Sequence, residues 1–376
     1  MKKTLLATAI AGSIAATGMM ATNVQAATVY DQDGTQLDIY GRISMGVRGG
    51  GPEEAVDTTG DGTPDSVRSN SEEFVDAYSR LGLNLSHEVS PDLTAFGRLE
   101  WRFQGDGGDN RFNAFTETRQ SYLGLRSDSW GTVQAGNFDS FYNQAVSIVF
   151  DRYIDRGLEF AGHPTQSRGD SIGYITPNLE GFQVYLQAKH YSERGEIEGQ
   201  IGDTNDRDVA LQGAMTYEID NLRLALGAVD DVTRGFDEDG SLNAGNDEML
   251  YGANVSYEFI PGFSGRLGYE TRSDNSDLDG DGNPIGGGFD TWGLGMSYAW
   301  NQWRFNADIY DVNPDNGSSR TSWAAGAYYN IASNFDVFLE LQQADQPSIT
   351  VFGDDGVVDT ADGDDLYWLT GARYLF

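Results

Sequence analysis

Residues 138–170 place charges of both signs in an apolar stretch. Asp151, Asp155 and Glu159 stand among arginines, after a run rich in Phe, Tyr and Val. The stretch is too long for an ordinary hairpin loop and too apolar for a solvated one, so we expect it to fold against other parts of the chain. We predict that the rest of the chain forms a wall and that this segment folds into the space that the wall encloses.

A second acidic cluster has residue types that could bind a metal. Asp277, Asp279 and Asp281 are spaced as at the start of a calcium-binding loop, and Gly282 follows them. Such a loop also needs a glutamate at its twelfth position, which is Gly288 here. The two interpretations are a weak surface calcium site and a solvated acidic turn, and the missing glutamate favours the turn.

Catalytic chemistry finds little support in the sequence. The three histidines, His87, His163 and His190, lie far apart, without the spacing of zinc ligands and without an evident serine partner. The chain has no cysteine, which excludes disulfides and thiol chemistry. We therefore expect a protein that is not an enzyme and that requires no cofactor.

The first 26 residues are expected to be an export signal. Lys2 and Lys3 precede an Ala-rich apolar stretch that is too short and too interrupted to span a bilayer, and residues 24–26 fit a small-residue cleavage pattern. The remaining chain, 27–376, is expected to form one domain outside the cytoplasm. Its sequence contains no later run of 18 apolar residues, so no transmembrane helix is expected.

From residue 35 onward, apolar residues recur at every second position. This period is typical of strands that have one apolar and one polar face. We count sixteen such segments, of which three, near 115–126, 130–137 and 168–176, are weaker than the others. Sixteen strands require fifteen connections, and the sequence supplies seven very short ones and eight long polar ones. An even strand number with short turns at one end and long loops at the other is typical of an outer-membrane barrel.

The polar face of the segments decides between a soluble barrel and a membrane barrel. It carries arginines, acids and Lys189, which suit an aqueous lumen better than a dry core. Aromatic residues gather at the strand ends beside the short turns, where an interfacial girdle belongs. We therefore predict an all-β fold, a sixteen-stranded antiparallel transmembrane barrel with long loops outside the cell and short turns on the periplasmic side.

The charge of the chain is strongly negative and unevenly distributed. The net charge is −34, which argues against nucleic acid as a partner. The eight long loops hold 30 of the 58 acidic residues but only 7 arginines. The loop face is therefore predicted to be anionic, and a surface this acidic and this poor in lysine suggests a salt-rich habitat.

The sequence resembles the general porins of Gram-negative bacteria, which are trimeric sixteen-stranded diffusion channels. The resemblance covers essentially the whole of 27–376. It rests on LDIYGR at 37–42, YSRLGL at 78–83, LTAFGRLEWRFQG at 93–105, YLGL at 122–125, LEFAG at 158–162 and the terminal YLF at 374–376. It implies a homotrimer in the outer membrane and insertion by the barrel assembly machinery, which would read Phe376.

The resemblance also implies that the third long loop, 138–168, folds into the barrel and constricts it. In the family, acidic residues of this loop face a ladder of basic residues on the wall. The residues that match the family's motifs are Asp155 and Glu159 on the loop, and Arg42, Arg80, Arg119 and Arg168 on the wall.

Strand parity supports some of these arginines independently. Arg42 and Arg80 alternate with the apolar positions of their strands, so they should point into the lumen. Arg119 shares its parity with the apolar Leu123 and Leu125, so it would need a bulge or cover by the folded loop. The family also commonly has an arginine where this chain has Asn137, which leaves open how a neighbouring subunit's loop would be held.

The expected function is a water-filled channel for passive diffusion of small hydrophilic solutes and ions, with cation preference from the acidic loops. A substrate-selective channel, for example for an anion such as phosphate, is the alternative. More remote alternatives are a barrel enzyme and an adhesin with a plugged pore. The acidic loops could also bridge to lipopolysaccharide through divalent cations.

Overall fold

The computed structural model of the chain describes residues 26–58, 63–106, 115–161, 169–190, 209–231, 246, 248–278, 284–352 and 358–376. Almost all of the regular structure in these ranges is β-strand. Among the described residues, no helix combines the length and the apolar character needed to cross a membrane.

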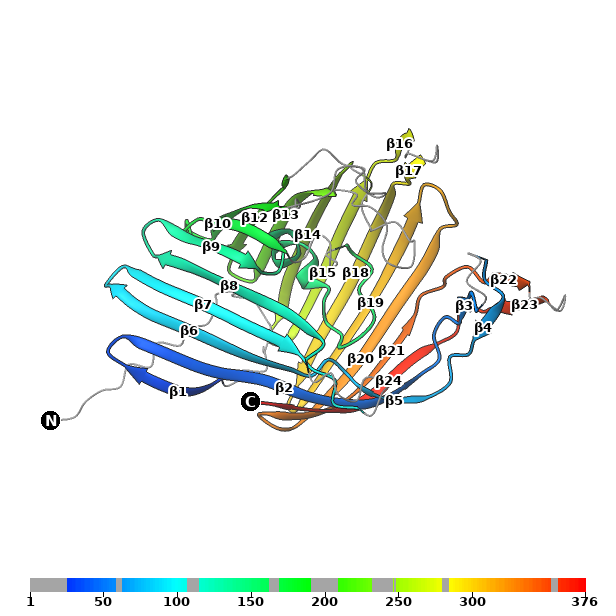
Figure 1. The fold of residues 1–376 in the computed structure, drawn as a ribbon, viewed down its shortest axis with the longest axis horizontal. Helices are drawn as coiled ribbons and strands as arrows, with labels where there is room; N and C mark the ends of the chain where they lie inside the picture. Colours follow the sequence, from blue (N-terminus) through cyan, green and yellow to red (C-terminus); the bar gives the residue numbers. More distant parts are fainter. Residues whose placement is uncertain are drawn as a thin grey trace.

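Sixteen strands form a closed antiparallel barrel, as the alternation predicted. Each strand pairs with the next along the chain, and the last pairs with the first, so the sheet closes (Figure 1). Closure pairs the backbone groups of both edges, which a membrane requires. In order, the strands are β2 (Thr35–Gly49), β6 (Arg80–Ser90), β7 (Leu93–Arg102), β8 (Glu117–Ser127), β9 (Gly131–Asn137), β10 (Asp170–Ile175), β11 (Phe182–His190), β12 (Val209–Ile219), β13 (Leu222–Asp231), β14 (Glu248–Ile260), β15 (Phe263–Arg272), β18 (Phe289–Trp300), β19 (Trp303–Pro314), β20 (Arg320–Ala332), β21 (Phe335–Gln343) and β24 (Tyr367–Leu375).

An additional strand, which we did not predict from the sequence, lies ahead of the barrel. Strand β1 (Ala27–Gln32) pairs with the first part of β2 through a two-residue turn at Asp33 and Gly34. Both turn residues have positive φ, 52° and 74°, as this tight hairpin turn requires. The Asp-Gly pair was a readable hairpin signal, and it lies just before the residue at which our count began.

The outer face of the barrel has the predicted apolar side chains. On β18, Trp292, Leu294 and Met296 are each about half exposed, at 48%, 51% and 49%, whereas the residues between them face inward. Aromatic rings cluster at the strand ends near the short turns, for example Trp303 stacked on Phe305 at 5.5 Å. These positions match a lipid-facing band with an aromatic border.

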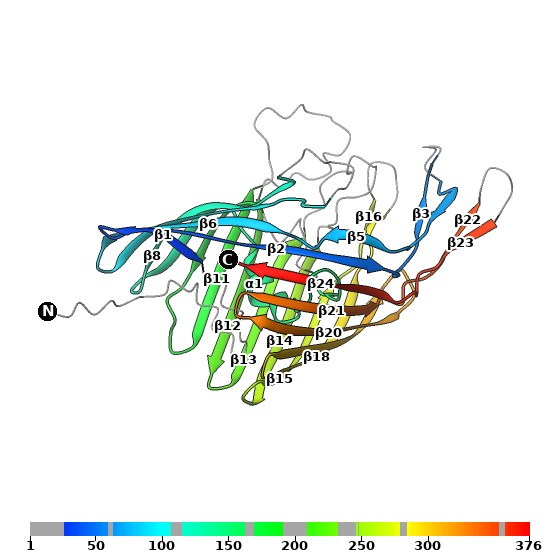
Figure 2. The same cartoon turned by 90° about the horizontal axis from the view of Figure 1, so that it is seen from below.

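Three short hairpins extend from the opposite end, where the long loops lie. They are β3 (Glu54–Val56) with β4 (Ser66–Arg68), β16 (Asn275–Leu278) with β17 (Pro284–Gly286), and β22 (Ile349–Phe352) with β23 (Val358–Ala361). The first and third lie side by side in both views (Figures 1 and 2), and the backbone N–H of Glu53 donates to the carbonyl of Asp362 at 2.7 Å. A further short strand, β5 (Glu73–Asp76), extends the pairing of β2 toward this end.

Candidate functional site

Between β9 and β10 the chain turns into the barrel, and we call residues 138–169 the inward loop. It begins with a one-turn helix, α1 (Phe141–Ala145), whose N-cap Ser140 accepts from the backbone N–H of Asn143 at 3.0 Å, and continues into the 3₁₀ turn η1 (Ser147–Val149). In Figure 2 α1 lies inside the ring of strands. Residues 162–168 of the inward loop lie outside the described residues.

The apolar side chains of the inward loop pack on the inner wall of β11 to β21. Tyr142 and Val146 pack against Ala214, Val229 and Leu250. Further along, Phe150 and Phe160 meet edge to face at 4.6 Å, and Ile154 packs in a separate cluster with Tyr328 and Phe338. The inward loop thus covers one side of the lumen, and its apolar side chains form a hydrophobic core together with those of the wall.

Glycines on the inner wall make room for these rings. A Cβ placed on Gly252 would lie 2.0 Å from the hydroxyl of Tyr142, and one on Gly268 would lie 2.7 Å from the ring of Phe150. Real side chains do not tolerate such distances, so these positions admit only glycine at this approach. Part of the high glycine content is thereby explained by loop docking rather than by turns.

Buried acids of the wall fix the backbone of the inward loop. Glu270 accepts hydrogen bonds from the Tyr142 hydroxyl at 2.8 Å and from the N–H of Ala161 at 2.6 Å. Glu340 accepts from the N–H of Ile154 at 2.7 Å. Both carboxylates are almost fully buried, so acids that alternation assigned to the lumen are in fact covered by the loop.

The opposite side of the lumen carries five arginines, Arg42, Arg80, Arg98, Arg102 and Arg119, which we call the arginine wall. Arg42, Arg80 and Arg102 stand directly opposite one another across β2, β6 and β7. Like charges in register repel, so this row opposes folding unless it is compensated. The side chains of Arg80, Arg98 and Arg102 are 31%, 34% and 31% exposed, so they remain in contact with solvent.

Glu117 pairs with Arg102 at 3.1 Å, and further compensation comes from Glu100, whose side chain is fully buried beneath the arginine wall. Its carboxylate lies 3.2 Å from Arg98 and 3.5 Å from Arg80, forms a short ion pair with Arg119, and accepts from the Tyr40 hydroxyl at 2.8 Å. One carboxylate therefore bonds to four donors, and it holds three guanidinium groups in place.

A bulge resolves the parity problem at Arg119. Glu100 pairs with Gln120 and Trp101 pairs with Thr118, so Arg119 is the extra residue on β8. The bulge turns its side chain toward Glu100 although Leu123 and Leu125 face lipid.

Tyr78 also has an unusual backbone conformation. Its φ of 64° is rare for a non-glycine residue, and its carbonyl accepts a hydrogen bond from Arg42 at 2.8 Å.

The two predicted acidic residues of the inward loop are both held by partners. Asp155 accepts from the Tyr78 hydroxyl at 2.6 Å and from Tyr367, and it lies 3.6 Å from Arg48. Glu159 pairs with Arg320 at 2.5 Å. Their role in selectivity stays a prediction, and Arg168 lies outside the described residues.

Two further acids of the inward loop face the arginine wall, and sequence reasoning did not assign them. Asp151 is exposed toward the lumen, and Asp139 lies 3.6 Å from Arg119. Enclosure by the barrel raises the pKa of both carboxyl groups, and the arginines oppose this shift. Burial lowers the pKa of the neighbouring Arg152 to about 9. Asp151 had no motif to mark it, because its orientation depends on how the loop docks.

Known proteins share this barrel architecture. A model of the Gram-negative porin family matches residues 4–347 of the chain. The chain belongs to the Gram-negative porin family. Its place in the outer membrane as a β-barrel follows, and the porin resemblance drawn from the sequence motifs is confirmed.

Relatives and solved structures extend this result. A monosaccharide porin from Halomonas sp is 26% identical over 397 residues, which cover 100% of this chain and 91% of the relative. The outer membrane porin protein OmpD of Citrobacter koseri is 26% identical over 357 residues, which cover 95% of this chain and 74% of the relative. The anion-selective porin from Comamonas acidovorans has a similar fold, with a TM-score of 0.66 at 17% identity, over 91% of this chain and 100% of that one.

Among the described residues, one group of acidic side chains lies close enough together to hold a metal ion, and it is exposed on a loop. Of the predicted calcium candidates, Asp279 and Asp281 and the side chain of Asp277 lie outside the described residues. Asp362, Asp364 and Asp365 bring carboxylate oxygens within 4.8 Å of one another. Asp365 accepts from Asn70 at 2.7 Å, so part of this cluster serves to join two loops.

Proposed function

We propose that this porin is a passive, water-filled channel for small hydrophilic solutes and ions. The observation that carries the proposal is the inward loop packed on one side of the barrel, with the solvent-exposed arginine wall on the other. A neck with charges on both sides favours ions and dipolar molecules, since apolar solutes would have to displace oriented water. Single-channel recording in planar bilayers tests it: stepwise conductance is expected, and its absence would contradict the proposal.

The channel is proposed to be cation-preferring, and the preference should depend on salt. The acidic loops act over a Debye length of roughly 30 Å at 0.01 M salt but only about 3 Å at 1 M. At high salt an ion inside the neck senses chiefly the nearby arginines. The cation-to-anion permeability ratio from reversal potentials should therefore be largest in dilute KCl gradients and should fall several-fold near 1 M. Anion preference in the dilute gradient would contradict this.

The acids of the inward loop are proposed to contribute to that preference. Asp155→Asn with Glu159→Gln removes two negative charges, so the cation-to-anion permeability ratio should fall by about two-fold or more in dilute KCl. A matched control, Glu54→Gln with Glu72→Gln, removes two exposed charges from the long-loop side of the barrel, on β3 and just before β5. If the control shifts the reversal potential as much as the loop variant does, the constriction role of Asp155 and Glu159 is refuted.

An anion-selective channel is the second candidate, and the arginine wall favours it. The side chains of Arg80, Arg98 and Arg102 are each about one-third exposed in the neck, whereas Glu100, the carboxylate that pairs with Arg80 and Arg98, is fully buried. The salt series above separates the two candidates. The proposal further includes assembly as a homotrimer and delivery by the barrel assembly machinery through Phe376, which the family resemblance supports, and contact of the acidic loops with lipopolysaccharide through divalent cations.

A further inference from the structure

A cavity of about 670 Å³ lies inside the barrel at its short-turn end, on the far side of α1 from the long loops. Strands β6 to β9 and β11 form most of its walls, and Asp38 of β2, Ile175 of β10 and Gln144 of α1 also line it. Its volume lies within the range of small-molecule sites. The function proposed above does not use this space, because the neck residues other than Arg98 lie outside it.

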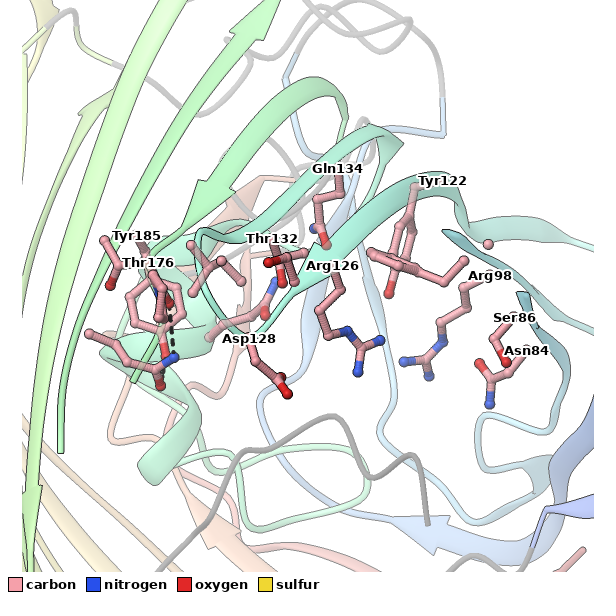
Figure 3. Close-up of a pocket in the computed structure, with 18 of the residues that line it drawn as sticks. Asn84, Ser86, Arg98, Tyr122, Arg126, Asp128, Thr132, Gln134, Thr176 and Tyr185 are labelled. Atoms are coloured by element: carbon pink, nitrogen blue, oxygen red, sulfur yellow. Dashed lines mark hydrogen bonds between the residues drawn. The ribbon is translucent and has the colours of Figure 1, made fainter. Parts of the chain in front are cut away.

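Two arginine side chains point into the cavity from neighbouring strands, Arg98 on β7 and Arg126 on β8 (Figure 3). The guanidinium of Arg98 is fixed: it lies 5.0 Å from the Tyr40 ring centroid, donates to the Tyr40 hydroxyl at 2.6 Å and pairs with Glu100. Arg126 stacks on the Phe96 ring at 5.1 Å. Within the described residues we find no carboxylate paired with Arg126. The N–H groups along the edge of its guanidinium group can therefore bind a ligand.

The rest of the lining carries hydrogen-bonding groups of the kind that bind hydroxyls. Asn84, Gln134 and Thr132 line the same wall as the arginines, and Asp128 lies at one side (Figure 3). Tyr122 adds an aromatic face, held edge to face by Phe96 at 6.3 Å. Amides and the carboxylates of Asp38 and Asp128 beside an aromatic ring suit a hydroxylated ligand, and guanidinium groups suit a carboxylate.

We propose that this cavity is a binding subsite for small polyhydroxylated carboxylates, that is, sugar acids, on their way through the channel. The carboxylate of the ligand would bind Arg126 and Arg98, and its hydroxyls would bind Asn84, Gln134 and Asp128. The proposal rests on the channel function above. It differs from a general anion preference, because it requires both the charge and the hydroxyls.

The test uses the intact porin in planar bilayers, with glucuronate as the probe and its neutral analogue glucose as the comparison. Glucuronate should interrupt the KCl current in resolvable events, whereas glucose and acetate at equal concentration should not. Arg126→Gln should weaken the apparent binding of glucuronate at least tenfold, and Arg126→Lys should weaken it less. Persistent KCl conductance in each variant shows that the channel is folded.

A matched control removes another stacked arginine from the same end of the barrel. Arg304 lies over the Tyr328 ring at 4.4 Å on β19 and is not among the residues that line the cavity. Arg304→Gln should leave glucuronate block unchanged. The subsite is refuted if Arg304→Gln and Arg126→Gln act equally, or if acetate or glucose blocks as well as glucuronate. Absence of KCl conductance would instead refute the channel function itself.

Discussion

Glu100→Gln is expected to shift the channel toward anions and to loosen the arginine wall. The substitution removes the one fully buried carboxylate that bonds Arg80, Arg98 and Arg119. In water, a unit charge about 7 Å away changes the electrostatic energy of a monovalent ion by roughly 0.6 kcal/mol, and the sign of this change is opposite for cations and anions. The cation-to-anion permeability ratio should therefore fall several-fold in dilute KCl, as measured by the reversal potential.

The same substitution should also lower the stability of the barrel. Charge-assisted hydrogen bonds contribute about 2 kcal/mol each, and the exposed guanidinium groups can recover part of this from lumen water. Urea unfolding followed by tryptophan fluorescence measures the loss. Glu54→Gln is the control, since Glu54 pairs with Arg68 at the surface with both side chains largely exposed. Equal changes in selectivity for the two variants would show that Glu100 does not set the field in the neck.

The barrel could be predicted from the sequence because its signal is local. Alternation with period two appears within each strand, and membrane placement follows from which face is apolar, as on β18. Turn chemistry is equally local, and Asp33-Gly34 would have revealed β1 had the count begun earlier. The fold therefore followed from short-range patterns that needed no knowledge of the rest of the chain.

The site was harder to predict from the sequence than the barrel, because its geometry depends on contacts between residues far apart in the chain. Nothing near Asp155 in the sequence indicates that Tyr78 and Tyr367 bind its carboxylate, since these residues come from opposite ends of the chain. The exposure of Asp151 likewise results from how the inward loop docks. Parity identified the difficulty at Arg119, but only the pairing of β7 with β8 locates the bulge.

The second large effect is expected from Phe150→Ala combined with Phe160→Ala. These rings pack on each other at 4.6 Å and on Tyr310 at 5.8 and 5.6 Å, and they fill the space that Gly268 leaves on the wall. Removing a buried phenylalanine costs about 3–5 kcal/mol. Because the strand ladder does not involve these side chains, the cost should fall on docking of the inward loop rather than on the barrel.

The expected result is a folded channel with a loosely held loop. Its single-channel conductance should rise and its open-channel noise should increase several-fold, because the loop would sample positions away from the wall. Phe259→Ala is the matched control, since that ring is 56% exposed on the outer face, and it should leave both quantities unchanged. Wild-type conductance and noise in the double variant would mean that the remaining attachments hold the loop without these two rings. Those attachments include the hydrogen bonds that Glu270 and Glu340 accept from the Tyr142 hydroxyl and from the backbone of Ala161 and Ile154.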